Sequence, residues 1–172
     1  SPAAERTVFM KINVSKTAEE LGRNAAKLCK KLIDETIAEK GSVRMVFSTG
    51  ASQFTTFEAL LKEDIDWSKV EMFHLDEYVA LPESHIASFR KYLKERFISK
   101  VHLKSVCLVN GEADLTEELA RLTREVRSAP VDIGLIGIGE NAHIAFNDPP
   151  ADFDTKEAYK VVNLSDTCKR QQ

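Results

Sequence analysis

The sequence predicts an α/β fold, a three-layer sandwich in which helices cover both faces of a mostly parallel sheet. Helical and strand patterns alternate along the chain, the strand patterns are short apolar runs, and polar loops follow three of these runs. With 172 residues, 43% of them apolar, the chain is long enough to bury a core. We therefore expect one domain that spans residues 1–172.

The first predicted helix spans residues 15–40, because apolar residues recur there at spacings of three and four. Thr17 and Glu20 have the spacing of a capping box, and Gly41 is suited to end the helix. The face that we expect to be buried comprises Leu21, Ala25, Leu28, Leu32 and Ile37.

The later elements alternate in the same way. Apolar runs predict strands over residues 43–47, 70–75, 105–109, 131–138 and 159–164. Between them, helical patterns end near residue 62 and span residues 84–98 and 114–127. The predicted apolar face of the helix over residues 84–98 comprises Ile86, Phe89, Leu93 and Phe97. The strand over residues 131–138 is the most apolar, so we expect both of its faces to be buried.

The end of the sequence carries a different signal. Residues 165–167 have the composition of a helix start, and the chain then stops at Gln172. We therefore expect that the C-terminal part of the domain is missing from this chain.

Charge and cysteine content exclude several classes of protein. A net charge of −3 with mixed signs provides no field for nucleic acid or for an anionic membrane, and no window is long and apolar enough to span a membrane. The three cysteines are far apart, and the four histidines share no metal-binding spacing with them or with each other. We expect a reduced cytoplasmic protein without a metal site. His74, inside an apolar strand, is expected to be a hydrogen-bonded core residue.

The first polar loop, Ser48-Thr49-Gly50-Ala51-Ser52, joins a strand to a helix. Its glycine permits a tight turn, and the N-terminus of the following helix offers free N–H groups with a partial positive charge. This arrangement suits a phosphate, although a capped turn without any ligand has the same pattern. The loop is not a nucleotide P-loop, because no Gly-Lys-Ser/Thr follows it.

The second loop begins with Asp76-Glu77-Tyr78, directly after the run VEMFHL. Acidic residues at the end of a buried strand must be solvated, paired or catalytic. A carboxylate with a moderately raised pKa is suited to act as a general base there. The alternative is that Asp76 caps the next segment.

The third loop, GIGENAHIAFNDP at residues 137–149, follows the most apolar strand. Its start fits the dinucleotide pattern G-x-G-x-x-G/A, but two prolines end the segment and no helix follows where the pyrophosphate would require one. His143 stands between Asn141 and Asp148, so one neighbour can orient its ring while the other contacts the substrate. Because the ends of parallel strands converge, we expect all three loops to form one site.

These three loops together resemble those of the glucosamine-6-phosphate deaminase (isomerase) family, which is related to the 6-phosphogluconolactonases. The most specific matches are LDEYVALP at residues 75–82 and GIGENAHIAFNDP at residues 137–149. The resemblance runs from the first helix to residue 172. It implies a modified Rossmann-like fold, a sugar phosphate as the small-molecule substrate, no cofactor, and an assembly between a monomer and a hexamer.

The resemblance also implies the reaction, conversion of glucosamine 6-phosphate and water to fructose 6-phosphate and ammonia. Asp76 matches the aspartate that abstracts the C2 proton, and His143 matches the histidine that helps to open the sugar ring. Asp148 stands where the family usually has a glutamate that supports this histidine. The phosphate would bind at Thr49, Gly50, Ala51 and Ser52, with Glu77 and Gly139 lining the substrate site.

The chain departs from the family pattern beside the histidine. Asn141-Ala142 replaces the family's Asp-Gly, so the charge that favours a protonated imidazole is lost, although Asn141 keeps the hydrogen-bonding shape and stays in the predicted catalytic set. Two other functions therefore remain open. One is another sugar-phosphate hydrolase, such as a 6-phosphogluconolactonase, and the other is a diverged regulator that binds a sugar phosphate.

Overall fold

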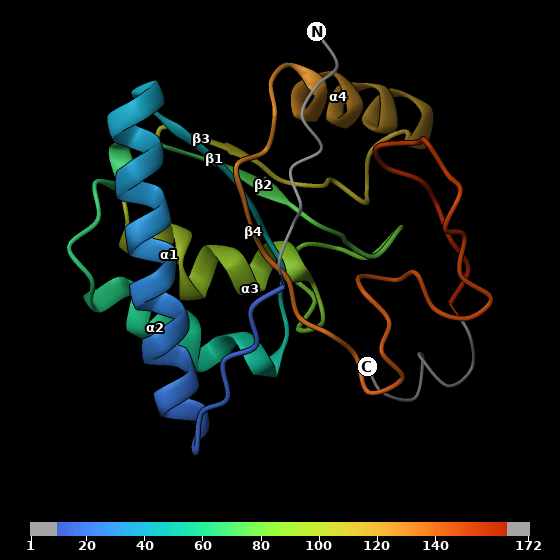
Figure 1. The fold of residues 1–172 in the computed structure, drawn as a ribbon. Helices are drawn as coiled ribbons and strands as arrows, with labels where there is room; N and C mark the ends of the chain where they lie inside the picture. Colours follow the sequence, from blue (N-terminus) through green and yellow to red (C-terminus); the bar gives the residue numbers. More distant parts are fainter. Residues whose placement is uncertain (1–9, 165–172) are drawn as a thin grey trace, which may run out of the picture.

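The computed structural model describes residues 10–164 and has a parallel sheet at its centre. In these residues four strands, β1 (Val43–Phe47), β2 (Val70–His74), β3 (Ser105–Cys107) and β4 (Ile133–Leu135), pair in the order β3-β2-β1-β4 (Figure 1). The chain adds β2 and β3 on one side of β1 and then returns to add β4 on the other side. The direction of winding therefore reverses between β1 and β4, which is where open α/β sheets bind their ligands.

The helices lie on both faces of the sheet, as predicted. They are α1 (Ala18–Lys40), α2 (Phe54–Lys62), α3 (Phe89–Arg96) and α4 (Leu115–Arg127), with short 3-10 helices at Ala51–Gln53, Trp67–Lys69 and Ile98–Lys100. Right-handed connections place α2 and α3 on one face and α4 on the other. Figure 1 shows α1 and α2 together on one side of the sheet and α4 on the opposite side. No helix among residues 10–164 is long and apolar enough to cross a membrane.

The main core lies between the sheet and the α1–α2–α3 side. Alternate residues of β1 and β2 point into it, and they are fully buried: Val43, Met45, Phe47, Val70 and Met72. Phe47, Phe57 and Phe97 form an aromatic cluster, with ring centroids 5.2 to 6.0 Å apart. This core fixes the strands whose carboxyl ends carry the polar loops.

The ends of α1 agree with the prediction. The Thr17 side chain caps the helix by accepting a hydrogen bond from the Glu20 backbone N–H at 3.1 Å. Gly41 ends the helix in the left-handed conformation, with φ of 82°, and its N–H donates to the Ile37 carbonyl at 2.8 Å. Both caps satisfy backbone groups that a helix end otherwise leaves unpaired.

The buried face of α1 differs from the prediction. Leu21, Leu28 and Leu32 are 46%, 50% and 39% exposed, and the buried positions are instead Gly22, Ala26, Cys29 and Ile33. The reason is the close contact with α2, since a Cβ at Gly22 would lie 2.6 Å from the Thr55 backbone. This approach leaves room for glycine alone at position 22, and it fixes which face of α1 turns inward.

Three other predicted elements also differ. α3 begins at Phe89 rather than near residue 84, because Ser88 caps it, and Ile86 is exposed before the helix. Within the described residues β4 pairs with β1 alone, and Ile138 just beyond it is 72% exposed rather than buried. Residues 159–164 form no strand, since they have no ladder partner in the described part of the chain. The predicted helix start at residues 165–167 lies outside the described residues.

Candidate active site

The first and third polar loops meet at the ends of β1 and β4, and Ser48 joins them. Its hydroxyl donates to the Leu135 carbonyl at 2.8 Å and accepts from the Gly137 backbone N–H at 3.1 Å and from Gln53 Nε2 at 3.0 Å. The contact is close, because a Cβ at Gly137 would lie 3.3 Å from Ser52 Oγ. The turn over residues 48–52 and the loop that begins at Gly137 are therefore neighbours, as the sequence predicted.

The second loop joins the third through aromatic contacts. The Phe146 ring lies 5.1 Å from the Tyr78 ring and 5.6 Å from the Phe89 ring, and Tyr78 and Phe89 are 5.1 Å apart. Tyr78 belongs to the loop after β2, and Phe89 begins α3. All three polar loops thus lie at one edge of the sheet, as expected for parallel strands.

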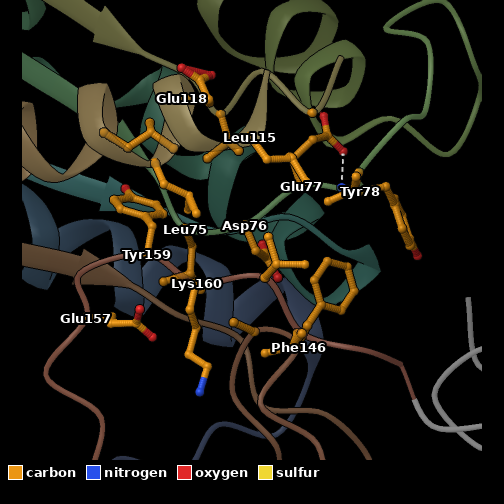
Figure 2. Close-up of a pocket in the computed structure, with 18 of the residues that line it drawn as sticks. Leu75, Asp76, Glu77, Tyr78, Leu115, Glu118, Phe146, Glu157, Tyr159 and Lys160 are labelled. Atoms are coloured by element: carbon orange, nitrogen blue, oxygen red, sulfur yellow. Dashed lines mark hydrogen bonds between the residues drawn. The ribbon is translucent and has the colours of Figure 1, made fainter. Parts of the chain in front are cut away.

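Asp76 follows β2 and lies partly buried in the wall of a cavity of about 740 Å³. Burial, and then the charge of neighbouring Glu77, raises its pKa to about 7. No hydrogen bond to its carboxylate is found among the described residues. Figure 2 shows Asp76 between Leu75 and Phe146. A carboxyl group with a pKa near neutrality and free oxygen atoms is suited to take up and release a proton.

Glu77 also borders the cavity, but its carboxylate is engaged by the protein. The side chain has no exposed surface, and it accepts five hydrogen bonds. The donors are the backbone N–H groups of Tyr78, Phe89 and Arg90, the Ser88 hydroxyl and Arg90 Nε. Figure 2 shows the bond to Tyr78. This carboxylate stabilises the N-terminus of α3, a position that favours negative charge. Its predicted contact with substrate remains a prediction.

Asn141 bridges the other two polar side chains of the third loop. Its Nδ2 donates to Asp148 Oδ1 at 2.5 Å, and its Oδ1 contacts His143 Nδ1. Because an amide oxygen only accepts hydrogen bonds, this contact places the imidazole proton on Nδ1 and leaves Nε2 for the substrate. Of the two neighbours that the sequence offered to orient the ring, Asn141 is the one in contact with it, and Asp148 contacts Asn141.

Gly139 serves this histidine by having no side chain. A Cβ at Gly139 would lie 2.1 Å from His143 Cε1, so only glycine fits beneath the ring. The Gly139 N–H donates to the His143 carbonyl at 2.8 Å, and the Ala142 N–H donates to the Gly139 carbonyl at 2.9 Å. Ala142 adopts a φ of 64°, a conformation that an L-residue with a Cβ disfavours. The tight loop thus contains a strained residue beside the catalytic candidate.

The turn predicted to bind phosphate has the expected geometry. Gly50 has a φ of 123°, and its carbonyl accepts hydrogen bonds from the Gln53 N–H at 3.0 Å and from Tyr92 Oη at 3.3 Å. Thr49 is half-buried, whereas Gly50, Ala51 and Ser52 are exposed at the start of the 3-10 turn that leads into α2. The free N–H groups of such a helix start favour an anion.

The predicted residues do not all line one cavity. Asp76 and Glu77 lie in its wall, whereas the turn over residues 49–52 and the group Asn141–His143–Asp148 do not. Much of the wall is instead apolar and comes from α4 and residues 145–164. Within residues 10–164, no three His, Cys, Asp or Glu side chains are arranged to hold a metal ion.

Three residues that position the site were not identified from the sequence. Ser48 and Gln53 connect the predicted phosphate turn to β4, and Arg90 holds Glu77. Ser48 directly precedes the predicted phosphate-binding residues 49–52. The sequence shows that a hydroxyl is present there, but it does not show its hydrogen-bond partners. Arg90 is a charged residue on a helix of which we predicted only the apolar face.

The fold and the site together define an α/β protein whose three polar loops meet at the carboxyl edge of a parallel sheet. The chain belongs to the glucosamine-6-phosphate isomerase/6-phosphogluconolactonase family, because the model of that family matches residues 16–171. The resemblance read from the polar loops is therefore confirmed.

Relatives named glucosamine-6-phosphate deaminase are similar over almost the whole chain. The proteins from Bacillus cereus (strain G9842) and Bacillus thuringiensis (strain Al Hakam) are each 34% identical to it over 162 residues, or 94% of the chain. The chain spans 60% of the length of these relatives.

Solved structures confirm the fold. A monomeric glucosamine-6-phosphate deaminase superposes with a TM-score of 0.82 and 30% identity, covering 94% of this chain and 68% of that protein. A 6-phosphogluconolactonase from Thermotoga maritima gives a TM-score of 0.66 at 20% identity, covering 72% of this chain and 58% of that one. The second match supports the shared fold alone.

Proposed function

We propose that the protein is a cytoplasmic enzyme that converts glucosamine 6-phosphate and water to fructose 6-phosphate and ammonia. The names of the relatives that are 34% identical support this activity. The observation that carries it is Asp76, a carboxyl group at the end of β2 with a pKa of about 7 and no hydrogen-bond partner in the described chain. An aldose–ketose isomerisation needs such a base to move a proton between adjacent carbons.

In the proposed mechanism, the phosphate binds at the exposed N–H groups of the turn over residues 49–52. His143 Nε2 takes the proton of the C1 hydroxyl and delivers it to the ring oxygen as the bond between C1 and the ring oxygen breaks, while Asn141 holds Nδ1. Asp76 in its ionised form then takes the proton from C2 and returns it to C1, while a proton passes from the amino nitrogen to the C1 oxygen, which gives the C2 imine of the ketose. Water adds at C2, and the amino group leaves as ammonia, so the overall change is a hydrolysis.

A lactonase is the second candidate, and the family description that covers both activities favours it. Hydrolysis of a lactone requires no proton transfer at C2, so a lactonase would retain its turnover in Asp76→Asn. A regulator that binds a sugar phosphate without turnover is the third possibility. It is motivated by Asn141, which lacks the charge that would favour a protonated His143.

The direct test is ammonia release from glucosamine 6-phosphate by the full-length protein, with 6-phosphogluconolactone hydrolysis measured in parallel. We expect ammonia and fructose 6-phosphate in equal amounts, and no lactone hydrolysis above the uncatalysed rate. No ammonia at high protein concentration would contradict the proposal. Lactone turnover would then support the lactonase, and binding of the sugar phosphate without turnover would support the regulator.

A further inference from the structure

Arg90 is a buried cation that joins four segments behind the catalytic candidate. Its guanidinium is only 5% exposed. Nε donates to Glu77 Oε2 at 3.2 Å, Nη1 donates to Asn110 Oδ1 at 2.8 Å, and Nη2 donates to the Leu81 carbonyl and to Glu112 Oε2, both at 3.1 Å. Arg90 therefore connects α3 to the end of β2, to the loop after it and to the loop before α4.

The two adjacent acidic residues at the end of β2 have opposite surroundings. Glu77 is fully buried and saturated with donors, one of which is the Arg90 guanidinium. Asp76 faces the cavity without a hydrogen-bond partner in the described chain, and its pKa is raised. Neighbouring carboxyl groups whose environments differ in this way are divided between two roles. One carries a fixed, compensated charge, and the other exchanges protons.

The other ionisable groups near Asp76 do not supply a positive charge to Glu77 in place of Arg90. His74 precedes it in β2, and burial lowers the pKa of this histidine to about 4, so the imidazole is neutral near pH 7. Its Nδ1 accepts a hydrogen bond from the Val109 N–H at 3.2 Å. The cavity beside Asp76 is also lined by Glu118, Asp152, Glu157, Tyr159 and Lys160.

Three of the charged groups across the cavity, Glu118, Asp152 and Lys160, are held in ion pairs. Lys160 pairs with Asp152 at 2.8 Å, and Glu118 pairs with Arg121 at 2.5 Å. Arg90 is thus the cation in direct contact with Glu77 among the described residues.

We propose that Arg90 is a positioning residue for Asp76: it compensates the Glu77 charge and fixes the loop over residues 76–78, so that Asp76 is the acidic group that exchanges protons. The structural part of this inference stands on the contacts of Arg90. Its consequence for turnover rests on the proposed deaminase activity.

Arg90→Gln removes the charge and keeps a side chain that can donate to Glu77. The backbone N–H groups of residues 78, 89 and 90 and the Ser88 hydroxyl still donate to Glu77, so its negative charge stays in place without its cation. The field of this charge at Asp76 becomes stronger and disfavours ionisation of Asp76. We expect the titration midpoint of Asp76 to rise by about half a unit to one unit.

The measurement is a carbon-13 NMR titration of the Asp76 side-chain carboxyl group, combined with the pH dependence of kcat/KM. The acid limb of the activity profile should move to higher pH by the same amount as the NMR midpoint. Lys91→Gln is the matched control, because it removes the same charge one residue along α3, where Lys91 pairs with Glu95 at 2.7 Å. This control should leave both midpoints unchanged.

Arg90→Lys tests the role if Arg90→Gln does not fold. A lysine keeps a cation beside Glu77 but cannot reproduce the guanidinium contacts to Asn110, Leu81 and Glu112. We expect the Asp76 midpoint to stay within about 0.3 units of the unsubstituted protein, with a lower kcat because the loop is less firmly held. An Arg90→Lys midpoint that moved beyond this range would overturn the proposal, as would an unchanged midpoint in a folded Arg90→Gln.

The two readouts separate this inference from the proposed function. If the Asp76 midpoint moves as expected but no ammonia is released, the positioning role stands and the deaminase activity is wrong. If ammonia is released and the Asp76 midpoint does not respond to Arg90→Gln, the deaminase activity stands and the positioning role is wrong.

Discussion

The loop that carries Asp76 and the loop that carries His143 meet at one sheet edge, but different kinds of contact hold them. Asp76 owes its environment to distant parts of the chain, namely α3, α4 and residues 145–164. His143 is oriented by Asn141 and Gly139, which lie within four residues of it. The environment of the proposed proton-transfer group thus depends on the whole fold, whereas that of the proposed ring-opening group depends on one short loop.

This difference has a consequence for pH dependence. The pKa of Asp76 is raised from 3.8 to about 7, first by burial and then by Glu77. The ionised form needed for catalysis therefore increases as the pH rises through about 7. The contribution of Asp76 to the stability of the fold changes with pH in the opposite direction. The folded state holds the Asp76 proton more tightly than the unfolded state, so the contribution of Asp76 is full below about pH 4 and is lost as the pH rises through about 7.

The largest expected effect comes from Asp76→Asn, which removes the proposed base and keeps its shape. Ammonia release should fall by a factor of about 100 to 10,000, measured as kcat/KM at pH 8. The increase of activity through about pH 7 should disappear in the residual rate. Glu71→Gln, on β2, the strand just before Asp76, is the control for a lost carboxylate and should have full activity. Retention of more than a tenth of the activity by Asp76→Asn would show that another group is the base.

A smaller effect is expected from His143→Gln, because a cyclic sugar opens to some extent without help. We expect kcat to fall about a hundredfold with the cyclic substrate. His102→Gln, at an exposed position outside the site, should leave kcat unchanged. An unaffected His143→Gln would mean that ring opening does not require the third loop.

Asn141→Ala tests whether local hydrogen bonds orient the histidine. The contacts of Asn141 with His143 and Asp148 would be lost, and one hydrogen bond is worth about 0.5–1.5 kcal/mol. We expect kcat to fall roughly 2- to 10-fold. Nitrogen-15 NMR should show His143 changing from a protonated Nδ1 to a mixture of both tautomers. Asn24→Ala, on α1, should change neither quantity; an unmixed His143 tautomer in Asn141→Ala would contradict the orienting role.

The smallest effect is expected from Ala142→Gly, which relieves backbone strain in the same loop. Ala142 has a positive φ, which costs an alanine about 1 kcal/mol relative to an unstrained conformation. The free energy of unfolding in urea should rise by up to about 1 kcal/mol. Ala113→Gly, at a loop position without a positive φ, should not be stabilising. Equal changes in the free energy of unfolding for Ala142→Gly and Ala113→Gly would show that backbone strain at Ala142 is not the cause.

The sequence predicted the convergence of the three polar loops, because the period and order of the elements determine that parallel strands end at one edge. It also placed Asn141, His143 and Asp148 in one group, because these residues are close in sequence. Features that depend on contacts between residues close in sequence can thus be predicted from short sequence patterns.

The sequence did not predict features that depend on distant partners. Arg90 reaches Glu77 and Asn110 from another element, and Ser48 reaches Leu135 and Gly137 from 87 and 89 residues away. The predicted buried face of α1 was also wrong, because the close approach of α2 at Gly22 turns a neighbouring face of the helix inward. Which face is buried depends on how closely two helices approach, and the spacing of apolar residues in the sequence does not give this distance.

The most direct test of Asp76 as the base is exchange of the C2 hydrogen of glucosamine 6-phosphate for deuterium in heavy water, followed by proton NMR. The account predicts that the glucosamine 6-phosphate remaining with the full-length protein at pH 8 exchanges its C2 hydrogen for deuterium, and that with Asp76→Asn this exchange is at least about a hundredfold slower. Turnover to fructose 6-phosphate by Asp76→Asn with the exchange rate unchanged would contradict the account.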